Sequence, residues 1–182
     1  MRYDHLSHVK ARVMRPLSML LITAAVLLAS ESAFAQRSAG SKILGEYNFY
    51  GGSAARSMQS ARESSLSYRD YVRTAPEQKV NVEVAKTAAD SIGDYIGKAQ
   101  KHMAWMRKQA ETSNDKETLT SLTSIDKNLA DAAKSHADMH ETCLKATVDG
   151  AATLDCCKVI DDSLAKAISE HDKLMKKVNA KK

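Results

Sequence analysis

The sequence predicts an all-α protein, an antiparallel bundle of three helices that becomes a four-helix bundle if residues 53–72 join it, preceded by a flexible N-terminal arm. Apolar residues recur at alternating intervals of three and four between residues 74 and 182, which is the period of one face of a helix. Turn-forming residues at 112–115 and 149–150 divide this stretch into three long helices. Short turns between long helices favour antiparallel neighbours.

The first 35 residues have the features of a cleavable export signal. Four basic residues and one acid precede an apolar run over residues 17–29. A run of this length is too short to cross a bilayer, which takes about 20 residues. Ala33 and Ala35 offer the small side chains that a signal peptidase recognises, so we expect cleavage before Gln36. The sequence therefore predicts an exported protein, periplasmic or extracellular, with no membrane span after cleavage.

The charge of the remaining chain argues against a nucleic-acid partner. Residues 1–35 contain 4 of the 27 Lys and Arg residues and 2 of the 22 Asp and Glu residues, which leaves 23 basic and 20 acidic side chains. The net charge thereby falls from +5 to +3. A weakly basic surface of mixed sign is not the electrostatic footprint of a nucleic-acid-binding protein.

Residues 36–73 are expected to form the mobile arm. Residues 36–52 are rich in glycine and serine and lack a sustained period. A weak helix is predicted over residues 53–72, where one helical face collects Met58, Ala61, Ser65, Tyr68 and Val72. Arginines and tyrosines alternate in this segment and form a candidate contact for an acidic surface or polymer, the alternative being a solvated helix or linker. The contact residues are Arg62, Tyr68, Arg69, Tyr71 and Arg73.

The bundle itself is predicted to occupy residues 74–182. A capping box of Thr74 and Glu77 starts the first helix, and Asn114 with Glu117 starts the second. The first helix has two candidate inward rows, which are Ala85, Ile92, Ala99 and Met106 on one line and Ala88, Tyr95 and His102 on the other. The second has Leu122, Ile125, Leu129, Ala132, His136, Met139 and Cys143. The third has Cys157, Ile160, Leu164, Ala167, His171, Leu174 and Val178.

The second and third helices resemble each other in sequence. Ile125-Asp126, Leu129-Ala130, Ala132 and His136 recur thirty-five residues later as Ile160-Asp161, Leu164-Ala165, Ala167 and His171. Any two bundle helices share heptad spacing, yet a shared Asp and a shared His suggest an internal duplication.

The three cysteines support two competing hypotheses. Cys143 and Cys157 lie equally far from Gly150, so the second and third helices should bring them face to face, and an exported protein favours a disulfide between them or between Cys143 and Cys156. The alternative is a soft-metal site for Zn or Cu, because histidines precede Cys143 at helical spacing. The candidate ligands are His140, Cys143, Cys156, Cys157 and, more remotely, His136.

His102 and His171 are expected in neighbouring layers of the bundle. Such a pair has the chemistry of a pH-sensitive contact or a second metal site, although hydrogen-bonded histidines within the core are the more ordinary outcome.

The sequence predicts a protein without catalytic activity or a cofactor. It has no Cys-x-x-Cys-His, no phosphate-binding glycine loop, no His-Glu-x-x-His and no Glu-x-x-His pair. We therefore expect a binding or structural module of the cell envelope, which contacts an envelope protein or polymer or assembles with itself. The alternative function is that of a periplasmic or secreted protein that binds Zn or Cu.

Overall fold

The computed structural model describes the backbone of residues 15–75, 79–145 and 147–180, with side chains from Leu44 onward. It contains four helices, which are α1 (Arg15–Thr74), α2 (Val82–Thr112), α3 (Lys116–Cys143) and α4 (Gly150–Ala180). Every regular element in these ranges is helical, so the all-α prediction is confirmed. Within the described part of the chain, no helix is both long and apolar enough to span a membrane.

The chain divides into two compact units, residues 1–43 and Leu44–Lys182. Residues 15–43 of the first unit are helical in backbone. The predicted signal peptide falls on residues 1–14, which lie outside the described residues, and on residues 15–35, whose side chains are not described. Cleavage before Gln36 therefore stays a prediction.

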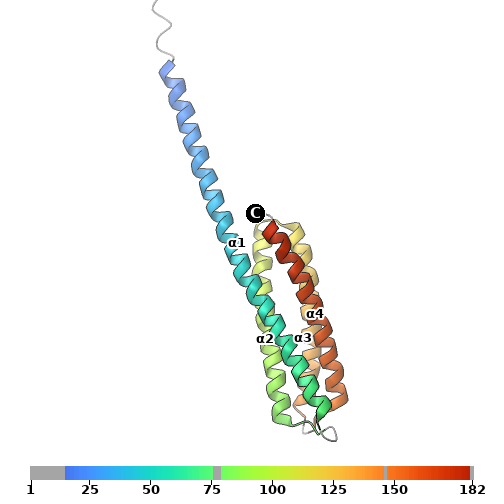
Figure 1. Ribbon diagram of the computed structural model, residues 1–182. Helices are drawn as coiled ribbons and strands as arrows, with labels where there is room; N and C mark the ends of the chain where they lie inside the picture. The colour runs from blue at the N-terminus through green and yellow to red at the C-terminus, as the bar shows by residue number, and fades with distance from the viewer. Residues whose placement is uncertain (1–14, 76–78, 146, 181–182) are drawn as a thin grey trace, which may run out of the picture. The chain divides into compact units, whose positions relative to one another are not determined.

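The second unit is a bundle of antiparallel helices. Figure 1 shows α2, α3 and α4 lying side by side with the last part of α1. α3 packs against α2 and α4. Polar contacts join α1 to both of its neighbours, because the Tyr47 hydroxyl donates to the Met106 carbonyl of α2 at 3.1 Å and Arg62 pairs with Asp161 of α4.

Residues 44–73, which were expected to belong to a mobile arm with at most a weak helix over 53–72, are helical and contribute to the core. The face predicted for residues 53–72 is the buried face of α1, and Tyr47 and Ala54 extend it toward the N-terminus. The helical period of residues 44–52 was not recognised, because Gly51 and Gly52 were interpreted as turn signals. Gly51 instead permits a close approach, since a Cβ atom there would lie 2.6 Å from Met175 Sδ.

The start of α2 also differs from the prediction. Thr74 ends α1 and its hydroxyl donates to the carbonyl of Asp70, so it does not cap the next helix. α2 begins at Val82, and Asn81 caps it by accepting from the amides of Glu83 at 2.9 Å and Val84 at 3.3 Å. Asn is at least as good an N-cap as Thr. The residue types alone therefore did not show whether the helix begins after Thr74 or after Asn81.

The turn between α2 and α3 shifts the second predicted cap by one residue. Asn114 adopts a positive φ of 54°, a conformation that Asn tolerates better than most residues. Asp115 is therefore the N-cap of α3, and its carboxylate accepts from the amide of Thr118 at 3.1 Å.

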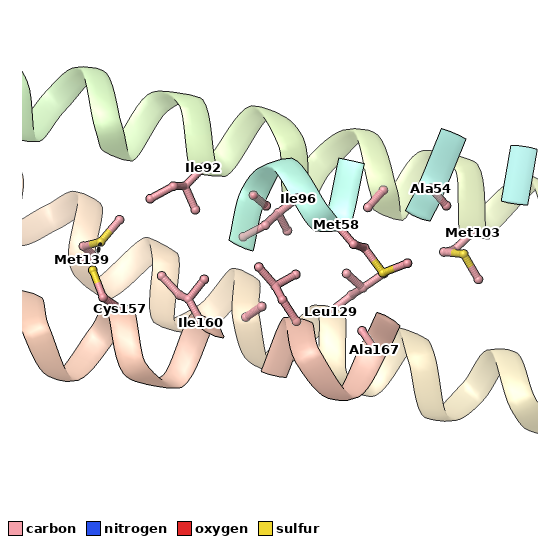
Figure 2. Packing of buried hydrophobic residues seen from close by; sticks show 14 of the residues in the cluster. Ala54, Met58, Ile92, Ile96, Met103, Leu129, Met139, Cys157, Ile160 and Ala167 are labelled. Carbon is pink, nitrogen blue, oxygen red and sulfur yellow. Dashed lines mark hydrogen bonds between the residues drawn. The ribbon is translucent and has the colours of Figure 1, made fainter. Parts of the chain in front are cut away.

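The core of the bundle follows most of the predicted inward positions. On α3 and α4 these positions are buried, except that Ser135 is more buried than His136 and that Val178 is only partly buried. On α2 the first predicted row is buried, but the second lies one residue further along the chain than predicted. That row consists of Ala89, Ile96, Met103 and Ala110. Figure 2 shows Ile96, Met103 and Leu129 in this core.

Candidate functional site

An apolar groove lies between α1 and α2 and has a volume of about 520 Å³. Each helix contributes side chains at positions i, i+3, i+4 and i+7. These are Ser64, Ser67, Tyr68 and Tyr71 on α1 and Val84, Thr87, Ala88 and Ser91 on α2, with Glu83 at one end. Val84 is 43% exposed in it. Sequence analysis missed this groove because its α2 wall combines small and polar residues that carry no motif.

A group of sulfur atoms lies inside the bundle, and one of them contacts Tyr68 of the groove wall. Cys143, Cys157 and Met139 are fully buried. The Cys157 thiol donates to Met139 Sδ at 3.7 Å, as the dashed line in Figure 2 marks. The Tyr68 hydroxyl lies 3.5 Å from Cys143 Sγ. Burial raises the pKa of Cys143 and raises that of Cys157 to about 11, so both side chains are thiols at neutral pH.

The predicted disulfide is not formed in this structure, where all three cysteines are free thiols. Cys156 lies outside the core and is half-buried, with its carbonyl accepting from the Ser135 hydroxyl at 3.1 Å. The expectation that Cys143 and Cys157 both face inward agrees with their burial.

The structure does not bring the five candidate metal ligands together. In the described part of the chain, no three His, Cys, Asp or Glu side chains are arranged to hold a metal ion. His136 Nε2 lies 2.7 Å from the carbonyl of Ala89, and His140 Nε2 lies 3.3 Å from Asp90 Oδ1, both on the α2 side of α3. His140 is rotated about 60° around the helix from Cys143, which places its ring at the surface and the thiol in the core.

His102 and His171 approach adjacent residues of α1, Tyr50 and Gly51, and whether the two rings act together stays a prediction. His102 lies beside Tyr50, with ring centroids 5.9 Å apart. His171 is only 2% exposed, and neither of its ring nitrogens makes a hydrogen bond within the described chain. Burial lowers the pKa of His171, and Asp172, whose Oδ1 lies 3.9 Å from Nδ1, acts in the opposite direction.

Most of the candidate contact residues on α1 serve the bundle itself. Arg62 Nε lies 2.6 Å from Asp161 Oδ1, and Arg69 lies 3.8 Å from the other oxygen of that carboxylate. Tyr68 is buried, and Tyr71 lines the groove while its hydroxyl accepts from the amide of Asn81. Arg73 is mainly solvent-exposed near Asp70. Arg62 and Arg69 therefore fix α1 to α4 through the carboxylate of Asp161, whereas Arg73 makes no ion pair with α4 in the described residues.

No protein family, curated protein or solved structure matches this chain. The functional argument therefore depends on the geometry described above.

Proposed function

We propose that this chain is an exported, non-enzymatic helical bundle that binds a partner protein of the cell envelope, and that the groove between α1 and α2 receives an amphipathic helix of that partner. The observation that supports this proposal is the matched spacing of the two groove walls. The export signal predicted from residues 1–35 supports the compartment.

A helix is the occupant that the groove fits best. Residues at i, i+3, i+4 and i+7 form ridges on each wall, and a third helix packs its own ridges between such rows. The small side chains Ser64, Ala88 and Ser91 allow its backbone to approach closely. Tyr71 and Val84 offer apolar surface for the anchor residues that a helix presents at i, i+3, i+4 and i+7.

Site-specific photo-cross-linking in the cells that produce the full-length chain tests this proposal. A photoreactive residue at Ser67, an exposed position of the groove, should cross-link to one envelope protein. Mass spectrometry should locate the cross-link in a segment with the apolar period of an amphipathic helix. The same residue at Lys127, an exposed position of α3 outside the groove, should not give this product.

A substitution that blocks the groove provides a second test of the proposal. Ala88→Lys places a long charged side chain in the groove and should abolish the cross-link from Ser67. Ala130→Lys makes the same change at an exposed position of α3 and should preserve it. Identical products from Ser67 and Lys127, or a product that Ala88→Lys does not affect, would contradict a partner helix in the groove.

The export step has its own measurement. Mass spectrometry of the protein isolated from an envelope or extracellular fraction should find an N-terminal peptide that begins at Gln36. A chain that keeps Met1 and fractionates with the cytoplasm would contradict this part of the proposal.

A further inference from the structure

The sulfur atoms inside the bundle form one cluster rather than separate core contacts. Cys157 Sγ is 3.7 Å from Met139 Sδ, and the Tyr68 hydroxyl is 3.5 Å from Cys143 Sγ. Ser65 and Tyr68 bring the two contacts to the same part of the bundle, because they lie one turn apart on α1: the Ser65 hydroxyl donates to the Cys157 carbonyl at 3.3 Å, and Tyr68 contacts Cys143. Met139 and Cys143 also lie one turn apart on α3, and all three sulfur-bearing side chains are fully buried. Two thiols and a thioether from α3 and α4 therefore share one water-excluded region.

We propose that Cys143, Cys157 and Met139 bind one Cu(I) ion in the interior of the bundle. This site is separate from the groove and goes beyond the proposed binding of a partner helix. Its ligands differ from the predicted set, because the thioether of Met139 replaces the histidines.

The chemistry of the ligands selects Cu(I) over other metals. Thiolates and thioethers are soft ligands, and a set made only of such sulfur atoms favours Cu(I). Zn(II) in structural sites takes four tetrahedral ligands from Cys, His, Asp and Glu. The nearest histidines are held toward α2 by the carbonyl of Ala89 and the carboxylate of Asp90, so they are not placed to complete a zinc site.

Binding of Cu(I) changes the number of protons and the net charge of the site in a defined way. Each thiol loses one proton on binding Cu(I), so two protons are released and the two thiolates with the ion carry a net charge of −1. Arg69, which follows Tyr68 on α1, supplies a partly buried cation that can offset this charge. Its Nε is buried without a hydrogen bond and lies 3.6 Å from Asp70 Oδ1, and its Nη1 lies 3.8 Å from Asp161 Oδ2.

The groove gives the ion a route to the cluster. The Tyr68 side chain lines the groove and also contacts Cys143 through its hydroxyl. Tyr68 thus separates the groove from the sulfur atoms, and a change of its rotamer would open the path.

Titration of the reduced, full-length chain with Cu(I) under anaerobic conditions tests the site. Competition with a chromophoric Cu(I) chelator should give one ion per chain, together with a sulfur-to-copper charge-transfer band. Cys143→Ser and Cys157→Ser should each abolish binding at that stoichiometry. Cys156→Ser is the matched control and should bind as the unmodified chain does, because Cys156 lies outside the cluster.

Met139→Leu is a second variant that tests the site even if a serine variant fails to fold. Leu preserves most of the volume of Met, so the bundle should retain its circular dichroism spectrum. Loss of this ligand should weaken Cu(I) binding by at least about 10-fold, because removal of groups that only support metal ligands already costs about 10- to 100-fold.

Three results would overturn the proposal. The first is the absence of Cu(I) uptake by the reduced chain. The second is an affinity that Met139→Leu leaves unchanged, or that Cys156→Ser lowers as much as Cys143→Ser does. The third is a disulfide between Cys143 and Cys157 in protein alkylated at the moment of cell lysis, since a disulfide removes both thiolate ligands. The Cu(I) titration is independent of the cross-linking experiment, because cross-linking tests the groove and the titration tests the sulfur atoms.

Discussion

The α2–α3 pair and the α1–α4 pair make the same two contacts with different degrees of burial. Asp126 of α3 accepts from Arg107 of α2 at 2.8 Å, and Asp161 of α4 accepts from Arg62 of α1 at 2.6 Å. Further along, His136 of α3 lies against Gly93 of α2. His171 of α4 approaches Gly51 of α1 less closely, with Met175 as the nearest neighbour of that glycine.

These equivalent contacts connect the sequence repeat to the structure. The repeated Asp and His face an Arg and a Gly on the neighbouring helix in both pairs, which a shared heptad alone does not require. The pairs diverge thirty-five residues apart at His140 and Met175. His140 lies beside a surface groove of about 460 Å³ with His136, whereas Met175 packs near His171 and Gly51. The difference at this position, one of several between the two repeats, accompanies the change from a half-buried to a buried histidine.

The largest expected effect tests whether the two pairs contribute equally to the core. Leu129 and Leu164 occupy equivalent positions of the repeat and are both fully buried. Leu129→Ala and Leu164→Ala should each lower the free energy of unfolding by about 2 to 5 kcal/mol, measured by urea denaturation. A negligible effect at either position would contradict the burial of that leucine between the helices of its pair.

The second prediction uses the difference between the histidines. Because burial lowers the pKa of His171, the unfolded chain takes up a proton there before the folded chain does, so stability should fall as pH decreases below about 6.5. His171→Gln should reduce this loss of melting temperature. Asp172→Asn should enlarge it, because the Asp172 carboxylate raises the pKa of His171. A pH profile that is the same in all three proteins would contradict the assignment.

The third prediction compares the two glycines. A Cβ atom at Gly93 would lie 2.5 Å from the ring of His136, which the carbonyl of Ala89 holds in place. Gly93→Ala should therefore destabilise the bundle by about 1 to 3 kcal/mol in thermal unfolding. At Gly51 the nearest atom belongs to the flexible end of Met175. Gly51→Ala should cost less, since the end of Met175 can move aside, whereas the gain in helix propensity of about 1 kcal/mol is common to both variants. Equal costs would mean that the two contacts are equally rigid.

The smallest expected difference concerns the ion pairs. The Asp161 side chain is 17% exposed and faces two arginines, whereas that of Asp126 is 38% exposed and faces one. Asp161→Asn should lower stability by about 1 kcal/mol and Asp126→Asn by a few tenths of that, because exposed ion pairs are weakened by solvent. Chemical denaturation in low and in high salt measures both. A larger cost at Asp126 would reverse the comparison.

The sequence allowed the buried faces of α3 and α4 to be predicted almost residue by residue, because Leu and Ile mark them clearly. On α2 the adjacent Ala88 and Ala89 fit either of two rows, and only packing against α3 and α1 selects Ala89. The length of α1 was underestimated because Gly51 was interpreted as a loop signal. Its actual role, to leave room for the Met175 side chain of α4, depends on a contact between helices that the sequence does not show.

The candidate site was harder to predict than the core. Heptad spacing brought Cys143 and Cys157 inward correctly, but the same spacing could not separate Cys143 from His140, whose directions differ by about 60°. The contact between Met139 and Cys157 joins two helices, and its thioether has no distinguishing motif. The groove between α1 and α2 was missed because the small and polar residues of its α2 wall carry no motif and because the weak helix predicted over residues 53–72 was assigned to an arm and not to the bundle.

The contact between Arg62 and Asp161 also bears on how the chain is made. The two residues are 99 positions apart in the sequence. At a synthesis rate of about 5 to 20 residues per second, α1 waits roughly 5 to 20 s for its partner on α4 to be translated. During that interval the apolar face around Met58 and Tyr68 has no α4 to cover it. The nascent chain therefore presents its first helix in a form that a chaperone or targeting factor can recognise before the bundle closes.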